Sequence, residues 1–244
     1  MGELLLGLVV NVVWVGIGLA GGFLIRKFAA AIPGRRLWGF KSVRSLSICA
    51  ATSTKTDTGQ YYRPATGIGQ VRALALVIGS LARAYGNVNT RNILLSEDEM
   101  TDRIESDLII LGGPKNNRIA QLLLEKIRPD SPVFQKDSVI SWQDAQGTAE
   151  FVPTVRDRVV TSDYGLIIRV GNPFSNDQHK VLLFSGAHTY GTVAAARFFT
   201  EDLLKKIPIR SSFDGDYFAV VSCDVVDGHP TGIALQKELL VRRV

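Results

Sequence analysis

Cysteine and histidine are scarce in this chain of 244 residues, which has two cysteines and three histidines. Cys49 and Cys223 stand far apart, each inside an apolar run typical of a strand. No Cys/His spacing typical of a metal site occurs, so we expect no bound metal. Two buried, reduced thiols are the simplest interpretation and are typical of a reducing compartment, with a disulfide as the alternative.

The best-known catalytic signatures are also missing. There is no P-loop, and no nucleophile elbow of the G-x-S-x-G type, although Ser, His and Asp are all present. We find no internal repeat and no low-complexity segment. These absences argue against a P-loop NTPase, an α/β-hydrolase and a solenoid.

Most of the chain has no excess of positive charge. The formal net charge is +5, and Glu3 with six bases near the N-terminus accounts for it: Arg26, Lys27, Arg35, Arg36, Lys41 and Arg44. Taking these from the 28 Lys and Arg and the 23 Asp and Glu leaves 22 bases and 22 acids in residues 45–244. We therefore expect no binding to nucleic acid, which a basic surface would favour.

One long hydrophobic run is present, from Leu4 to Ile25, and it contains no charged residue. A helix needs roughly 20 apolar residues to cross a hydrocarbon core of about 30 Å, so the run is long enough. A cleaved signal peptide is the alternative, because residues 29–31 are alanines; however, the n-region carries Glu3 and no base. We predict a transmembrane signal anchor at residues 1–27.

The bases that follow this run predict its orientation, because positively charged flanks stay in the cytoplasm. We expect a single-pass protein of the cell membrane, with a basic juxtamembrane linker at residues 28–44 near anionic headgroups and a cytoplasmic domain at residues 45–244. Five glycines in the run favour self-association of the helix within the bilayer: Gly7, Gly16, Gly18, Gly21 and Gly22. The general abundance of glycine in membrane helices explains them equally well.

Short apolar runs alternate with helical periodicity along the domain. We predict strands at residues 45–51, 91–96, 107–111, 139–142, 149–152, 166–170, 181–184, 217–226 and 233–241. Helices are predicted from residue 70, at residues 119–127 and at residues 192–206, with a long loop at residues 52–69. This alternation is typical of a Rossmann-like three-layer α/β sandwich, with a mostly parallel sheet and antiparallel additions at residues 164–185 and at the C-terminus.

Ligands of such sheets bind beyond the carboxyl ends of the strands, and three loops there are candidates. In the first, Gly67 and Gly69 open a predicted helix, where bare backbone amides suit a phosphate. The match to the dinucleotide fingerprint is partial, since Arg72 stands where the third glycine belongs. A glycine-bearing helix start without a ligand is the alternative.

The second loop contains Gly112, Gly113 and Asn117, with Lys115 as a cation beside them. Adjacent glycines permit positive φ and close approach of a ligand, and Asn117 suits a helix cap. A tight turn without a ligand explains the same residues.

The third loop supplies hydroxyls, an imidazole and exposed backbone from Ser185, Gly186, His188 and Thr189. We expect Thr192 to cap the helix that follows. A lone histidine such as His188 is also commonly a hydrogen-bonding loop residue.

Candidate catalytic residues are Glu97, Glu99 and His188. The two glutamates follow the second predicted strand, where related folds place a carboxylate. A solvated helix start is the alternative for them.

The segments at residues 107–117 (DLIILGGPKNN) and 184–195 (FSGAHTYGTVAA) together resemble the GGPxxN and GxxxxGTxAA motifs of a Rossmann-like module. That module is found in prokaryotic surface-layer-type and uncharacterised membrane-anchored proteins. The resemblance covers about residues 105–200 and implies a fold, not an activity. In architecture the chain is similar to membrane-anchored effectors of bacterial anti-phage systems, in which such domains sense or consume nucleotides, but no motif assigns it to the TIR or SLOG families.

Three functions are compatible with these features. The leading hypothesis is a membrane-anchored cytoplasmic nucleotide-binding sensor or effector, as in bacterial antiviral defence. The second is a hydrolase of a nucleotide glycosidic bond, such as that of NAD, with Glu97 or Glu99 as the carboxylate. The third is a structural or scaffolding membrane protein without a ligand.

Overall fold

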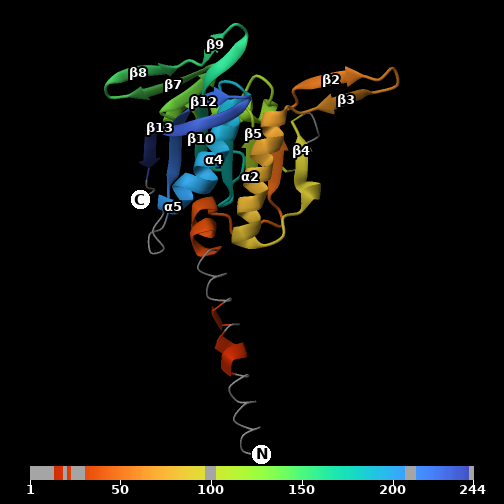
Figure 1. Ribbon diagram of the computed structural model, residues 1–244, viewed down its shortest axis with the longest axis vertical. Coiled ribbons are helices and arrows are strands. Elements are labelled where there is room, and N and C mark those ends of the chain that lie inside the picture. The colour runs from red at the N-terminus through yellow and green to blue at the C-terminus, as the bar shows by residue number, and fades with distance from the viewer. Residues whose placement is uncertain (1–13, 19–20, 23–30, 97–102, 207–212, 242–244) are drawn as a thin grey trace, which may run out of the picture.

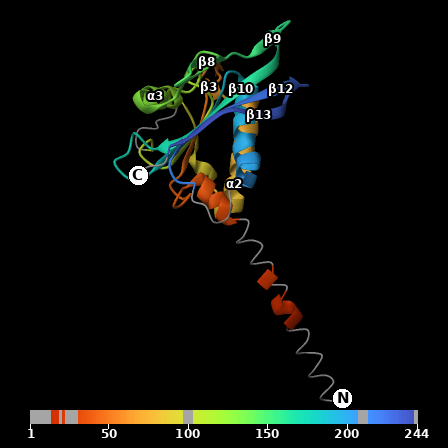
Figure 2. The same cartoon turned by 90° about the vertical axis from the view of Figure 1, so that its left-hand side faces the viewer.

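A computed structural model describes residues 14–18, 21–22, 31–96, 103–206 and 213–241. It shows a mixed α/β domain in which helices cover both faces of a central sheet (Figure 1). In the view turned by 90°, α3 (Arg118–Ile127) lies on one side of the sheet and α2 (Ile68–Tyr85) on the other (Figure 2). The layered α/β fold predicted from the sequence is therefore confirmed.

The central sheet has eight strands in the order β13-β12-β10-β11-β5-β1-β4, with β9 paired to β10. Four neighbouring strands run parallel: β11 (Lys180–Gly186), β5 (Leu108–Leu111), β1 (Ser47–Ala50) and β4 (Ile93–Leu95). The others add antiparallel pairs: β9 (Thr154–Arg156), β10 (Val159–Gly171), β12 (Asp216–Val226) and β13 (His229–Val241). The predicted antiparallel additions at residues 164–185 and at the C-terminus are both present.

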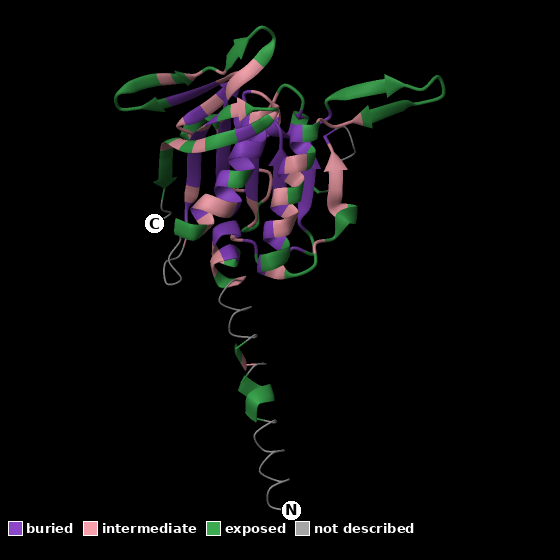
Figure 3. Ribbon diagram, in the orientation of Figure 1, coloured by how far each residue is buried: buried purple, intermediate pink, exposed green. Residues whose placement is uncertain are grey.

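The central strands are short and almost wholly apolar because both of their faces are covered. All four residues of β5 are fully buried, as are most of those in β11. Burial is concentrated in the centre of the sheet and on the inner faces of the helices (Figure 3). Such runs are recognisable from sequence without any alternation, which is why these strands were predicted within a few residues.

One face of the sheet is covered by α2 (Ile68–Tyr85) and α4 (Thr189–Arg197), which pack against each other. After α4 the chain continues through a π-helical turn, Phe198–Leu203, and a last helical turn, α5 (Leu204–Lys206). Their inner residues form a core with alternate residues of β1, β5, β10, β11 and β12. A helix from residue 70 onward is confirmed, but its buried face differs from the one that the sequence predicts. Val71, Ala75 and Ala82 were expected to be buried and are exposed, whereas Ala73, Val77 and Ala84 face the core. Of the predicted face, Leu81 is buried, and Leu74, Ile78 and Tyr85 are partly buried.

The opposite face is covered by α3 (Arg118–Ile127) and a small antiparallel sheet of β6 (Val133–Lys136), β7 (Val139–Asp144) and β8 (Gly147–Phe151). A second core joins them to the other face of the central strands. Short 3₁₀ turns at Thr90–Asn92 and Arg128–Asp130 complete the connections. The two cores on either side of one sheet make the three layers.

Residues 31–43 belong to the first core, although the sequence analysis assigned residues 28–44 to a linker. Residues 31–38 are helical, and Leu37 and Trp38 are fully buried. Trp38 packs its ring against Phe199, with 5.0 Å between centroids. The buried guanidinium of Arg169 donates to the Trp38 carbonyl, and burial lowers its pKa to about 10. The basic residues masked a short amphipathic helix, so the domain begins earlier than predicted.

The segment at residues 52–69 is not simply a loop, as predicted, but carries a projecting hairpin of β2 (Thr54–Asp57) and β3 (Tyr62–Ala65). The residues of β2 and β3 are exposed except Ala65, which is half-buried, and the hairpin extends sideways from the domain (Figure 1). Because both faces are solvated, no alternation of apolar and polar residues marks these strands.

Among the described residues, no helix is both long and apolar enough to cross a membrane. Much of the predicted span lies at residues 1–13, 19–20 and 23–27, outside the described part of the chain. Trp14, Val15 and Ile17, which belong to the run and are described, are exposed. The membrane anchor therefore stays a prediction from sequence.

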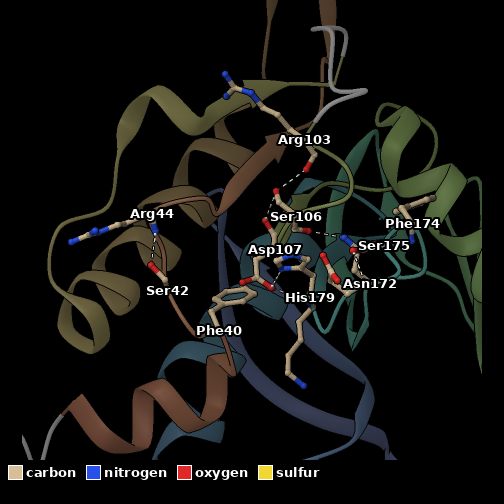
Figure 4. A network of polar contacts seen from close by, with 12 residues as sticks. Phe40, Ser42, Arg44, Arg103, Ser106, Asp107, Asn172, Phe174, Ser175 and His179 are labelled. Atoms are coloured by element: carbon tan, nitrogen blue, oxygen red, sulfur yellow. Dashed lines mark hydrogen bonds and ion pairs between the residues drawn. The ribbon is translucent and has the colours of Figure 1, made fainter.

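A polar network joins the β10–β11 connection to the start of β5 (Figure 4). Asn172 donates through Nδ2 to the carbonyls of Ile104, at 2.8 Å, and Ser106, at 2.6 Å. Oδ1 of Asp107 lies 3.4 Å from Nδ1 of His179. These groups are engaged with one another, so the network holds this end of the sheet together.

Candidate ligand-binding site

A cleft of about 370 Å³ lies at the carboxyl ends of β1, β5 and β11. Four segments line it: residues 53 and 67–70, residues 113–116, residues 135–138 and residues 186–192. Its volume lies within the range of small-molecule sites, about 300–1,000 Å³. The three loops selected from the sequence therefore meet in space, together with the β6–β7 turn, which was not selected.

Charged groups of both signs line the cleft. Lys115 supplies an exposed ammonium group and Asp137 a carboxylate, while the half-buried His188 adds an imidazole. Asp137 adopts a left-handed backbone conformation, with φ of 53°, in the tight turn between β6 and β7. A ligand with an anionic part beside Lys115 and neutral polar groups elsewhere fits this lining.

The start of α2 forms one wall of the cleft. Gly67 is its N-cap residue and provides no side-chain cap, and the first turn has no acidic residue. The positive end of this helix dipole is therefore not compensated by a local side chain. An anion placed here would be stabilised by the helix and by Lys115 together.

At the start of α4, the positive end of the helix dipole is balanced by the carboxylate of Asp163, which is fully buried. Its carboxylate accepts hydrogen bonds from the backbone N–H groups of Tyr164 (2.8 Å), His188 (3.0 Å) and Gly191 (2.6 Å). Burial raises the pKa of Asp163, and these three hydrogen bonds offset only part of that effect. Asp163 thus shapes the loop before α4 and supplies the negative charge that a ligand would supply at α2.

Gln135 and Ser185 form the floor of the cleft. The Ser185 hydroxyl donates to Gln135 Oε1 at 2.5 Å, and Gln135 Nε2 donates to the Gly186 carbonyl at 2.8 Å. A Cβ at Gly113 would lie 2.8 Å from Ser185 Oγ and 3.0 Å from Gln135 Nε2. Gly113 is therefore needed to leave room for this pair.

Gln70 lies between the first two loops and lines the cleft with only 8% of its surface exposed. A Cβ at Gly67 would lie 2.7 Å from its Oε1, and a Cβ at Gly112 would lie 3.3 Å from its Nε2. Within the described part of the chain, its Oε1 has no hydrogen-bond partner. A buried polar atom left unpaired costs about 1–3 kcal/mol, so its presence in a cleft calls for an explanation.

Among the residues proposed from sequence to bind a ligand, Gly67, Gly113, Gly186 and Thr189 line the cleft. His188, a catalytic candidate, lines it as well. Glu97 and Glu99 lie outside the described residues. The hypothesis of a glutamate acting on a glycosidic bond is therefore neither helped nor opposed by the structure.

Four other candidates have structural roles outside the lining. Gly112 adopts φ of +99°, a conformation that favours glycine, in the turn after β5. Asn117 is 1% exposed and caps α3 by accepting from the amides of residues 119 and 120, as predicted. Ser185 is buried beneath the cleft. Gly69 lies inside α2, where a Cβ would clash with Thr189, so it allows α2 and α4 to approach each other.

The helix after the third loop begins three residues earlier than predicted. Thr192 was expected to be its cap, but α4 starts at Thr189 and His188 occupies the N-cap position without a side-chain cap. The capping acceptors come instead from Asp163 on β10, far away in sequence. A cap of this kind leaves no local signal in the chain.

Gln70, Gln135 and Asp163 were missed by reasoning from sequence. Gln70 stands three residues after an N-cap glycine, the place of the acidic or amide residue in a capping box, and this spacing was a usable signal. Gln135 and Asp163 lie in strands with no local signal of a special role, and only the packing of the sheet places Gln135 in the cleft and Asp163 beneath the start of α4.

Both cysteines are buried and neither forms a disulfide, as predicted, and burial raises the pKa of Cys223 to about 12. Within the described ranges, no group of three or more His, Cys, Asp and Glu side chains is arranged to hold a metal ion. No protein-family model matches this sequence, and no curated protein is significantly similar to it.

Proposed function

We propose that this chain is a membrane-anchored protein whose domain binds a nucleotide, or a closely related phosphate-bearing ligand, in the cleft lined by Ser53 and residues 67–70, 113–116, 135–138 and 186–192. The observation that carries the proposal is the meeting of an uncapped α2 start with Lys115 in one cleft at the carboxyl ends of parallel strands. Helix starts of this kind bind phosphate through backbone amides, and the strand ends of an open α/β sheet are where nucleotides bind.

The remaining lining supports a ligand that is more than an inorganic anion. The cleft is about 370 Å³, and hydroxyl and amide groups from Ser138, Gln135 and Thr189 surround it. A free phosphate would occupy only a small part of this space. A sugar or base attached to the phosphate would use the remaining polar groups.

We expect nucleotides to stabilise the purified full-length chain against thermal unfolding. The probes are ATP, NAD and cyclic di-AMP, and a ligand present at 100 times its dissociation constant should stabilise the domain by about 2.7 kcal/mol. Replacing Lys115 with alanine should weaken binding by about tenfold, since it removes one charge-assisted contact worth ~1.4 kcal/mol.

Lys126→Ala is the matched control, because Lys126 is also an exposed lysine but lies on α3 and does not line the cleft. It should leave affinity unchanged. Stabilisation by none of the three nucleotides would refute the proposal and favour a structural module without a ligand.

The membrane part of the proposal rests on the uncharged run from Leu4 to Ile25 and on the bases that follow it. We expect a fluorescent reporter that matures only in the cytosol to be bright when fused to the C-terminus, and the chain to sediment with membranes. A dark reporter in membranes that hold the fusion protein would place the domain outside the cell.

With the domain in the cytoplasm, nucleotide binding would change the self-association of the anchor helices.

A further inference from the structure

The Gln70 side chain is the feature of the cleft that its packing does not explain. Across the described ranges, Gln70 Oε1 is the one buried side-chain oxygen or nitrogen that has no hydrogen-bond partner. The side chain is 8% exposed and lines the cleft at the third residue of α2. The glycines at positions 67 and 112 leave the space that its amide occupies.

Gln135 provides an internal comparison. It is also 8% exposed and lines the same cleft, but its Oε1 accepts from Ser185 and its Nε2 donates to Gly186. Gln135 is therefore a structural residue with its polar atoms paired. Gln70 has the same side chain and the same burial, yet no described residue donates to its acceptor. An unpaired buried acceptor is destabilising, so a donor from outside the protein is the expected partner.

We infer that Gln70 determines ligand specificity by accepting a hydrogen bond from a hydroxyl or amino group of the bound nucleotide. This inference rests on the proposed function and adds a requirement to it. The anionic group of the ligand would lie at the start of α2, close to Lys115. Its hydrogen-bond donor would lie at Gln70, less than one helical turn away. A phosphate that carries a ribose or an amino-bearing base satisfies both requirements, whereas inorganic phosphate satisfies only the first.

Two substitutions separate a ligand-reading role from a structural one. Gln70→Met keeps the volume of the side chain and removes an unpaired acceptor, so the free protein should melt at the same temperature as wild type or higher. Gln135→Met removes paired groups and leaves the Ser185 hydroxyl and the Gly186 carbonyl without their partners, so it should melt lower. If Gln70→Met melts as low as Gln135→Met, Gln70 is structural and the inference fails.

The binding arm uses the full-length chain and the tightest of ATP, NAD and cyclic di-AMP in titration calorimetry. Gln70→Met should bind that nucleotide about tenfold more weakly than wild type does. The wild type should also bind one analogue of that nucleotide about tenfold more weakly than the nucleotide itself. This analogue is the 2′-deoxy form, the 3′-deoxy form or the form without the base amine. That analogue should bind Gln70→Met and wild type equally, which identifies the group that Gln70 reads.

The outcomes distinguish this inference from the proposal beneath it. Nucleotide binding that is weakened by Lys115→Ala but unchanged by Gln70→Met would overturn the inference and leave the proposed function standing. Binding of inorganic phosphate as tight as that of the nucleotide would overturn the inference, and with it the part of the proposal in which a sugar or base uses the polar lining. The absence of binding by all three nucleotides to the wild type would overturn both.

Discussion

A chain shortened to residues 45–244, the domain predicted from sequence, is expected to lose cooperative folding, whereas residues 31–244 should fold. The shortened chain lacks Leu37 and Trp38, which are fully buried, and Phe40 and Val43, which are 5% and 7% exposed. Truncating a single buried Leu costs about 2–5 kcal/mol and a single Trp about 3–5 kcal/mol. The free energy of unfolding of a domain is only about 5–15 kcal/mol, so losing these side chains removes most or all of it.

Urea unfolding followed by circular dichroism measures the difference between the two chains. Within the full-length chain, Trp38→Ala should lower the free energy of unfolding by about 3–5 kcal/mol, because its ring packs against Phe184 and Phe199. Trp14→Ala is the matched control, since Trp14 is 66% exposed and should change the unfolding of the domain little. Equal stability of the chains beginning at residues 31 and 45 would show that residues 31–43 do not belong to the core.

Replacing Asp163 with alanine is expected to destabilise the domain by about 3 kcal/mol or more. The substitution leaves three backbone N–H groups, of Tyr164, His188 and Gly191, without their acceptor, and each buried donor left unpaired costs about 1–3 kcal/mol. The loop at residues 186–191 should also lose its shape, so nucleotide affinity should fall with stability. Chemical unfolding measures the first effect and calorimetry the second.

Asp163→Asn is the informative control. An amide oxygen can still accept from Tyr164 and His188, but its NH₂ group faces the N–H of Gly191, so the loss of stability should lie between those of wild type and alanine. A loss below about 1 kcal/mol for Asp163→Ala would contradict the capping role.

The raised pKa of Asp163 also predicts a dependence on pH. Its folded pKa lies above the ordinary value of 3.8, so between these two values the folded state binds more protons at this site than the unfolded state does. The contribution of Asp163 to stability should therefore fall as the pH rises from 3.8 through the folded pKa, and then level off. The difference in unfolding free energy between wild type and Asp163→Asn, measured over this range, should show that slope, and a difference that grows in favour of wild type would oppose the assignment.

The parts predicted best from sequence were those governed by continuous apolar runs. The strands near residues 47–50, 108–111 and 217–226 were predicted correctly. A strand that is buried on both faces needs a continuous apolar run, whichever strands lie beside it in the sheet. The cap of α3 by Asn117 was found for a similar reason, since donor and acceptor lie within three residues. The three loops of the cleft were found because they follow strands.

The parts predicted poorly depend on contacts between distant residues. The helix at residues 31–38 was taken for a linker because Arg35 and Arg36 dominate its composition, yet Arg35 donates to the carbonyl of Ala84 at 2.7 Å and lies over the ring of Tyr85. The β2–β3 hairpin was missed because it buries almost nothing. The local sequence indicated a linker in the first case and gave no indication of strands in the second.

The sequence by itself determined the α/β class, the order of most strands and helices, and the three loops that follow the parallel strands, because these features depend on hydrophobic periodicity and on local turn and cap chemistry. Only the tertiary structure decided which side chains in those loops line the cleft. It placed Asp163 beneath the start of α4 and closed the space around Gly69 and Gly112. It also left the Gln70 oxygen in the cleft without a donor from any described residue. The physical reason is that hydrogen-bond pairing and close packing depend on which residues meet across the sheet, and that is settled by the packing of the whole domain.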